Sequence, residues 1–281
     1  MESPTKFTHA LSFLPYESGN VLDYALGIQS FESREKTSKR GKAQRPTKSM
    51  KPFVVDFCPL PSSLLGKRSS GESGPDLLTK AIAPRKGFEQ GAIVYDLMAG
   101  MGQDSLLIAN AGAKRVHMVE RDPIVAALLE DALRRLHVLS EQADDDRQRQ
   151  LATDLWRCLS LEVKDGREVL AQFMDDSTKE RPDIVYLDPM FPARKKSASV
   201  KKNMQVLQGL LETRQVAEEE RLKEESELLQ AAYHATGCRV VVKRPVNAEQ
   251  LGGSLFSTEL KPSYQIKGSV NRWDVYVKSV L

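Results

Sequence analysis

The stretch "YLDPMFPARKKSASVKK", which begins at Tyr186, places an acid, two prolines and an aromatic ring after an apolar run. A nitrogen lone pair on a nucleobase amine is delocalised into the ring, so methyl transfer to it requires groups that draw the nitrogen out of the ring plane. A carboxylate and a backbone carbonyl that accept the two N–H bonds can do this and can stabilise the developing charge. An aromatic side chain can stack on the base, which is worth about 1–3 kcal/mol. The catalytic candidates are Asp188, the Pro189 carbonyl and Phe191.

Basic residues follow this turn and predict contacts with phosphates. The candidate RNA-binding residues are Arg194, Lys195, Lys196, Lys201 and Lys202, together with Lys243 and Arg244 of "VVVKRP". A solvated loop is the simpler alternative. A second basic run, residues 34–51, has eight Lys or Arg and one acid in a chain whose net charge is only +3. Such local clusters favour a polyanionic partner, and a solvated linker is the alternative.

Apolar runs and helical periodicities alternate from residue 92 onward. Strands are expected at 92–98, 115–120, 159–163, 183–188 and 239–245, and helices at 104–113, 122–139, 167–174 and 202–236. Two closing strands with a turn near Gly268 end the pattern. Asp122 as N-cap and Pro123 at the first helical position mark one helix start. The alternation predicts an α/β fold, a doubly wound, mostly parallel sheet with helices on both faces.

The loop "DLMAGMGQD" follows the first of these strands, at the sheet edge where such folds bind ligands. Asp96 ends the strand, and Gly100 and Gly102 allow a sharp turn beside a ligand, although a plain tight turn would look the same. A dinucleotide fingerprint requires a third glycine, where this chain has Ser105 preceded by Asp104. A carboxylate there repels a pyrophosphate. It suits S-adenosylmethionine (SAM), which carries a sulfonium and an ammonium and no phosphate.

Two further loops at this edge carry acids. Glu120 of "VERD" follows the glycine loop at the interval expected for an acid that accepts hydrogen bonds from ribose hydroxyls. A favourable charge at a helix N-terminus is the alternative, but Asp122 already fills that position. Asp165 and Gly166 of "VKDGRE" form the third loop, and an acid there can meet an adenine amino group. The edge therefore combines acids suited to each part of SAM.

Composition limits the remaining classes of protein. No window approaches the roughly 18 apolar residues of a membrane span, and no signal-peptide core opens the chain, so a soluble, intracellular protein is expected. Three cysteines and four histidines are scattered, so no metal site is expected. The predicted organisation is a flexible basic extension (1–51), a small segment with a strand, a Gly/Ser loop and a helix (52–91), and a methyltransferase domain (92–281).

The motifs "D-x-x-A-G-x-G-x-D", "VERDPIVAALLEDAL", "VYLDPMFPARKKSASVKKNMQV" and "RVVVKRP" together resemble the RsmJ-type SAM-dependent methyltransferases. The resemblance extends from "KPFVVDF" to the C-terminus. It implies a Rossmann-like class I fold and methylation of the exocyclic N2 of a guanosine in small-subunit ribosomal RNA. The cofactor contacts that it implies are Gln103, Asp104, Glu120, Arg121, Asp165, Gly166 and Asp188. The family usually has Arg in place of Gln103 and two serines in place of Asp165 and Gly166.

Other functions stay open at this point. A similar acid–Pro–aromatic turn would serve methylation of another nucleic-acid amine, such as N6 of adenine. A catalytically silent RNA-binding factor of ribosome assembly could keep the same fold. A nicotinamide oxidoreductase fits poorly because the third glycine is missing. The expected partner is ribosomal RNA or the small ribosomal subunit, and the expected location is the cytoplasm, or a plastid or mitochondrial interior if the N-terminal region is a targeting segment. Neither the modified nucleotide nor the oligomeric state follows from the sequence.

Overall fold

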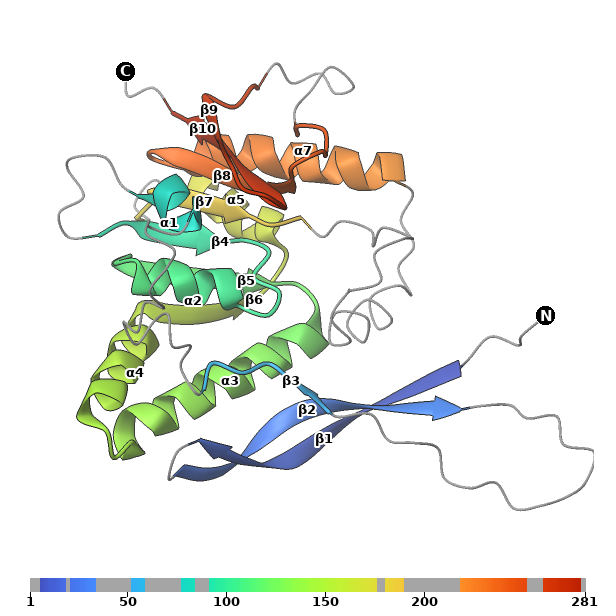
Figure 1. Ribbon diagram of the computed structural model, residues 1–281. Helices are drawn as coiled ribbons and strands as arrows, with labels where there is room; N and C mark the ends of the chain where they lie inside the picture. Colours follow the sequence, from blue (N-terminus) through green and yellow to red (C-terminus); the bar gives the residue numbers. More distant parts are fainter. Residues whose placement is uncertain are drawn as a thin grey trace, which may run out of the picture.

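The computed structural model describes residues 6–18, 21–33, 52–58, 77–83, 91–175, 180–189, 218–251 and 260–278. Its centre is a seven-stranded sheet in the order β6-β5-β4-β7-β8-β10-β9 (Figure 1). The five parallel strands are β4 (Ile93–Asp96), β5 (Arg115–Glu120), β6 (Leu159–Val163), β7 (Ile184–Leu187) and β8 (Arg239–Pro245). β10 (Asn271–Val277) pairs antiparallel with β8 and with β9 (Tyr264–Lys267). The predicted mostly parallel sheet is confirmed.

Helices cover both faces of this sheet. The helices are α1 (Leu77–Ile82), α2 (Gln103–Asn110), α3 (Pro123–Gln142), α4 (Asp146–Cys158), α5 (Gly166–Asp175) and α7 (Glu218–Ala235). Side chains of α1 to α4 pack in one hydrophobic core with one face of the sheet, and those of α5 and α7 pack in a second core with the other face. Each face has its own core because successive side chains of a strand point to opposite faces. On β8, for example, Val241 belongs to the first core and Val242 to the second. Among the described helices, none is long and apolar enough to span a bilayer.

The helix α4 is absent from the sequence-based prediction. Its sequence, "DRQRQLATDLWRC", is strongly polar, and the acids Asp144 and Asp145 precede it. The last of those acids, Asp145, is the N-cap and accepts hydrogen bonds from the backbone N–H groups of Arg147 and Gln148. The buried residues Ala152 and Leu155 lie three apart on the face that meets α3. A capping residue followed by this spacing was the available signal.

A long β-hairpin precedes the sheet. It comprises β1 (Lys6–Ser18) and β2 (Val21–Ser33), and β2 also pairs with β3 (Phe53–Val54). The lack of sustained periodicity before residue 50 predicted no regular structure, which is wrong for these two strands. Residues 34–51, the whole basic run, lie outside the described residues. The predicted division at residues 51 and 91 stays a prediction, although the pairing of β2 with β3 crosses the first boundary.

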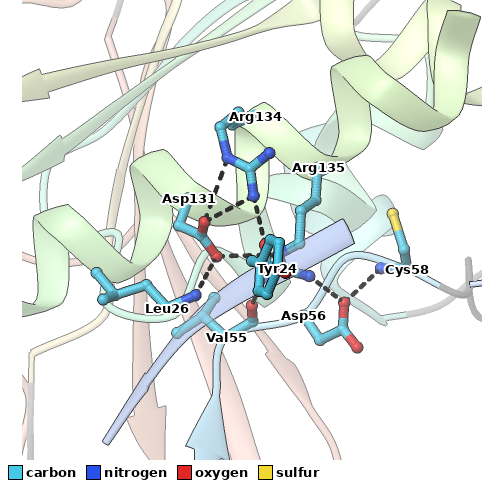
Figure 2. Close-up of polar contacts among 8 residues, drawn as sticks. All are labelled: Tyr24, Leu26, Val55, Asp56, Cys58, Asp131, Arg134 and Arg135. Carbon is cyan, nitrogen blue, oxygen red and sulfur yellow. Dashed lines mark hydrogen bonds and ion pairs between the residues drawn. The ribbon is translucent and has the colours of Figure 1, made fainter. Parts of the chain in front are cut away.

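A buried ion-pair network fixes this hairpin to α3 (Figure 2). Asp131 of α3 accepts hydrogen bonds from the backbone N–H of Leu26 at 2.8 Å and from Nε of Arg135 at 2.9 Å. Arg135 also donates to Asp56 Oδ1 at 2.7 Å and to the carbonyl of Val55 at 2.5 Å. The Arg135 side chain is only 2% exposed. One guanidinium therefore links α3 to the segment after β3, and its partner Asp131 links α3 to β2.

Replacement of Arg135 by methionine should lower the free energy of unfolding by about 3 kcal/mol, because it leaves buried acceptors without their charged donor. Urea denaturation measures this change. Arg134→Met is the matched control, since Arg134 contacts the same Asp131 from a side chain that is 45% exposed. An exposed pair contributes about 1 kcal/mol or less. Equal losses in the two variants would contradict a special role for the buried guanidinium.

Candidate functional site

The glycine loop after β4 has the sharp turn that the sequence predicted. Gly100 and Gly102 have φ angles of +52° and +68°, which disfavour residues with a side chain. A Cβ atom at Gly102 would lie 2.7 Å from Phe57 Cζ and 2.8 Å from Leu129 Cδ2. The loop thus packs directly on the segment after β3 and on α3. Gln103 begins α2, so the loop leads straight into a helix N-terminus.

Asp96 lies beneath this loop rather than on its surface. Its carboxylate accepts a hydrogen bond from Ser105 Oγ at 2.6 Å, and the residue is 1% exposed. Burial raises the pKa of Asp96 to about 7, and the hydrogen bond from Ser105 only partly opposes this shift. Asp96 has almost no surface to offer a ligand, in contrast to the predicted cofactor contact. Ser105, at the position where a dinucleotide fingerprint has its third glycine, thus supplies the hydroxyl that donates to this acid.

Glu120 joins the glycine loop to the start of α3. Its Oε2 atom accepts from the backbone N–H of Gly100 at 2.9 Å, and its Oε1 atom accepts from that of Asp122 at 2.8 Å. Asp122 itself caps α3, as predicted, by accepting from Ile124 and Val125. Burial raises the pKa of Glu120, and the backbone N–H bonds oppose the shift. Each carboxylate oxygen can accept a second hydrogen bond, so a contact with ribose hydroxyls stays a prediction that the geometry allows.

A small pocket brings together Arg121, Asp165 and Gly166 from the next two loops. Arg167 donates from its backbone and its guanidinium to Asp165, at 2.9 to 3.0 Å, and these bonds lower the pKa of that carboxyl. Arg121 NH1 lies 3.8 Å from Asp165 Oδ2. The opposite wall comes from α7, with Arg221, Glu224, Glu225 and Leu228. These α7 residues carry no motif, so sequence analysis missed them.

Lys243 connects two carboxylates that belong to different loops. Its ammonium lies 2.6 Å from Asp104 Oδ2 and 3.0 Å from Asp188 Oδ2. The Tyr186 hydroxyl also donates to Asp104 Oδ2 at 2.6 Å. The sequence predicted Lys243 as a phosphate contact, whereas its ammonium is engaged inside the site. Tyr186 opens the stretch with which the sequence analysis began, but no role was predicted for it.

The charged groups in this cluster shift one another's pKa. Burial raises the pKa of Asp188, and the attraction of Lys243 is the main opposing influence. Burial by itself would lower the pKa of Lys243, but Asp188 and Asp104 outweigh it and raise that pKa. The lysine is therefore a permanent cation that favours the ionised form of Asp188. Pro189, the next residue, is buried and continues the chain beyond β7.

Arg244 is placed differently from the sequence prediction. It is 2% exposed, pairs with Glu225 at 3.2 Å and donates to the carbonyl of Glu249 at 2.8 Å. A buried guanidinium has no surface for a phosphate, so this predicted RNA contact is wrong. The remaining candidates lie outside the described residues: Phe191, Arg194, Lys195, Lys196, Lys201 and Lys202. Within the described ranges, no group of three or more His, Cys, Asp or Glu could hold a metal ion.

The arrangement fits a cationic cofactor. Asp104, Glu120, Asp165 and Asp188 follow or face the carboxyl ends of neighbouring strands, and the glycine loop leaves backbone close to that edge. An acidic edge disfavours a pyrophosphate and suits a sulfonium or ammonium next to a diol. The residues that could hold SAM are therefore those of the glycine loop, the end of β5 and the loop after β6.

Comparisons with known proteins agree with this chemistry. The model of a family described as "Putative SAM-dependent methyltransferase" matches residues 34–278. A "Ribosomal RNA small subunit methyltransferase J" from Shewanella amazonensis is 41% identical over 231 residues, 82% of this chain and 79% of its own length. A relative of the same name from Shewanella oneidensis is 37% identical over 254 residues, 90% of this chain and 88% of its own. The family match starts one residue after β2 and includes every site residue described above.

A solved structure is similar over most of the chain. It is the crystal structure of a SAM-dependent methyltransferase from Neisseria gonorrhoeae, with a TM-score of 0.57 and 27% sequence identity. The similarity covers 90% of this chain and 79% of that one.

Asp96→Asn should alter how stability depends on pH. The pKa of Asp96 rises from 3.8 to about 7 on folding, so the folded protein binds this proton more tightly than the unfolded chain. The associated stability is present below the unfolded pKa and is lost as the pH rises to about 7. The free energy of unfolding of Asp96→Asn, minus that of the wild type, should therefore increase by on the order of 2 kcal/mol between about pH 5 and about pH 8. Urea denaturation without ligands tests this, and a pH-independent difference would contradict the assigned burial.

Lys243→Met should move the acidic side of the pH profile of kcat/KM to higher pH. Lys243 lowers the pKa of Asp188, so without the ammonium a smaller fraction of this carboxyl is ionised at a given pH. Lys243→Arg keeps a cation and should keep most of the profile. Lys80→Met, on the exposed side of α1, controls for loss of a lysine. The assignment fails if the methionine variant loses activity equally at every pH.

Proposed function

Because this chain belongs to the family of SAM-dependent methyltransferases, we propose that it transfers a methyl group to the exocyclic N2 of a guanosine in small-subunit ribosomal RNA. The chain is an enzyme that uses SAM, and its named relatives act on ribosomal RNA of the small subunit. The observation that carries the proposal is the pairing of Asp188 with Lys243 at the end of β7, directly before Pro189. This turn presents a carboxylate beside the edge that suits the cofactor.

The residues of the chain have separate roles in the proposed methyl transfer. SAM supplies the methyl group as a reactive sulfonium. Asp188 and the Pro189 carbonyl accept the two N–H bonds of the guanine amine, which turns the nitrogen lone pair away from the ring. Lys243 keeps Asp188 ionised, and Phe191 stacks on the base. The nitrogen–carbon bond forms as the sulfur–carbon bond breaks, and the extra proton leaves to water. Positioning supplies much of the acceleration, so no strong general base is required.

The proposal also covers binding of the cofactor and its substrate. Gly100, Gly102, Gln103 and Asp104 hold the charged end of SAM, Glu120 holds the ribose, and Arg121, Asp165 and Gly166 border the adenine. Lysines and arginines after the catalytic turn contact the RNA backbone. We place the enzyme in the cytoplasm with the ribosomal subunits, and an organelle that contains ribosomes is the alternative. The oligomeric state is not part of the proposal.

Asp188→Asn should reduce methyl transfer by about 100-fold or more, since a charged acceptor aimed at developing charge is lost while the shape is kept. Transfer from radiolabelled SAM is measured on naked small-subunit rRNA and on assembled small subunits, and the labelled nucleoside is identified. Asp154→Asn, at an exposed position of α4, is the matched control and should retain activity.

Label recovered as N2-methylguanosine, and lost in Asp188→Asn, would establish the reaction and its acid. Label on N6 of adenine would assign a different amine. An absence of transfer on both substrates, with SAM binding intact, would leave a binding factor rather than an enzyme for this RNA.

A further inference from the structure

The Tyr186 side chain is fully buried, yet its hydroxyl reaches a carboxylate at the carboxyl edge of the sheet. The residue is 0% exposed, and its hydroxyl donates to Asp104 Oδ2 at 2.6 Å. Asp104 lies in the first turn of α2, 82 positions away in the sequence. Burial, together with the nearby Asp104 and Asp188, raises the pKa of Tyr186. The hydroxyl therefore stays protonated and remains a donor across the neutral pH range.

Strand pairing explains why this hydroxyl points at α2. Tyr186 is the register partner of Asp96 on β4 and of Val241 on β8. Register partners present their side chains to the same face of a sheet, and on this face Ser105 of α2 donates to Asp96. Two adjacent residues of α2, Asp104 and Ser105, are thus both bonded to side chains of the central strands. The start of α2 is held on the sheet by these two hydrogen bonds.

Two donors share one oxygen of Asp104. Lys243 Nζ lies 2.6 Å from the same Oδ2 atom that accepts from Tyr186. A carboxylate oxygen has about two acceptor sites, so Tyr186 and Lys243 fill Oδ2, and Oδ1 is used by neither of them. The Asp104 side chain is 20% exposed, which leaves it surface for a ligand. Two donors on one oxygen fix the rotation of the carboxylate and thereby the direction in which Oδ1 presents its lone pairs.

The charges around this carboxylate leave it negative. Asp104 and Asp188 both pair with Lys243, so two carboxylates share one ammonium, a net charge of −1 (−2 + 1). The Tyr186 hydroxyl adds a donor and no charge. A second cation in its place would neutralise the remaining negative charge, whereas a neutral hydroxyl orients Asp104 and leaves that charge to attract a cationic ligand. The sulfonium and ammonium of SAM are cations of this kind.

We propose that Tyr186 is a positioning residue for cofactor binding, whose hydroxyl holds Oδ2 of Asp104 so that Oδ1 of the same carboxylate meets the cationic methionine part of SAM. The inference rests on the proposed function, in which Asp104 holds the charged end of the cofactor. Tyr186 acts through Asp104 and takes no part in the chemical step. Because Tyr186 precedes Asp188 by two residues, the strand that leads to the catalytic turn also sets the geometry of the cofactor-binding acid.

Tyr186→Phe removes the hydroxyl and keeps the ring. It should weaken binding of SAM about tenfold, the factor expected for loss of a hydrogen bond to a charged group. The affinity for 5′-methylthioadenosine should stay at the wild-type value, because this analogue has the adenine and ribose but a neutral sulfur and no ammonium. Isothermal titration calorimetry measures both affinities. In methyl transfer, KM for SAM should rise by the same factor while kcat is retained.

Tyr276→Phe is the matched control. Tyr276 of β10 is 1% exposed, and its hydroxyl donates to the carbonyl of Leu251 at 3.0 Å. Its side chain packs in the second core, on the face of the sheet opposite to Tyr186. The control variant therefore loses a tyrosine hydroxyl of similar burial that has no contact with Asp104, and it should bind SAM with wild-type affinity.

A double-mutant cycle separates positioning of Asp104 from general damage to the site. In Asp104→Ala the group through which Tyr186 acts is already lost, so adding Tyr186→Phe should change the affinity for SAM by less than about twofold. Wild-type affinity for SAM in Tyr186→Phe would overturn the assignment. So would equal weakening of SAM and 5′-methylthioadenosine, or the same loss of SAM affinity with and without Asp104.

The binding measurements need no RNA, so the two proposals fail separately. Wild-type protein that binds SAM but forms no N2-methylguanosine would overturn the proposed reaction, while the calorimetry would still decide the role of Tyr186. Tenfold weaker SAM binding in Tyr186→Phe, absent in the Asp104→Ala background, would establish the positioning role whichever amine is methylated.

Discussion

The ionised state of the carboxylates at the carboxyl edge of the sheet is the constraint on which the rest of the site depends. Acids at neighbouring strand ends repel one another and lose hydration as the loops close over them. Each acid has its own means of stabilisation. Glu120 has two backbone N–H groups, and Asp165 has Arg167. Asp96 is the exception, because burial raises its pKa to about 7 and the Ser105 hydroxyl only partly opposes this. Asp188 and Asp104, which lies on α2, both form an ion pair with Lys243. The acids that suit a cationic cofactor are thus prepared by the fold before the ligand arrives.

These contacts also make the site continuous with the N-terminal hairpin. Glu120 ties the glycine loop to α3, Gly102 packs against Phe57, and Asp131 of the same helix holds β2. Because α3 is a 20-residue helix with a buried apolar stripe, it transmits position along its length without bending to local changes. The hairpin, distant in sequence from Asp188, is in this way held by the same helix whose N-cap residue, Asp122, donates its backbone N–H to Glu120.

Much of the fold was predictable because the parallel strands are buried on both faces, and their short apolar runs leave little ambiguity. β5, β6 and β8 match their predicted bounds, and the N-cap of α3 lies where Asp122 and Pro123 placed it. The helix α4 was missed although its N-cap and the spacing of its buried residues were a local signal. The hairpin was missed for a different reason, because contacts such as that of Asp131 with the backbone N–H of Leu26 join residues 105 positions apart. Local pattern has no information on such pairs.

The partners of the cations at the site could not be predicted from the sequence either. Sequence alone treats Lys243 and Arg244 as surface charge at a binding edge. The strand alternates its side chains, however, so one faces the acids of α2 and β7 while the other faces Glu225 of α7. Arg272 on β10 is likewise paired with Asp274 and donates to the carbonyls of Pro245, Val246 and Ala248. Three cations near the end of β8 are therefore used to hold the site and the turn after it. Positive charge for RNA must then come from other parts of the chain, such as the predicted contacts Arg194, Lys195 and Lys196 that follow Phe191 in the sequence.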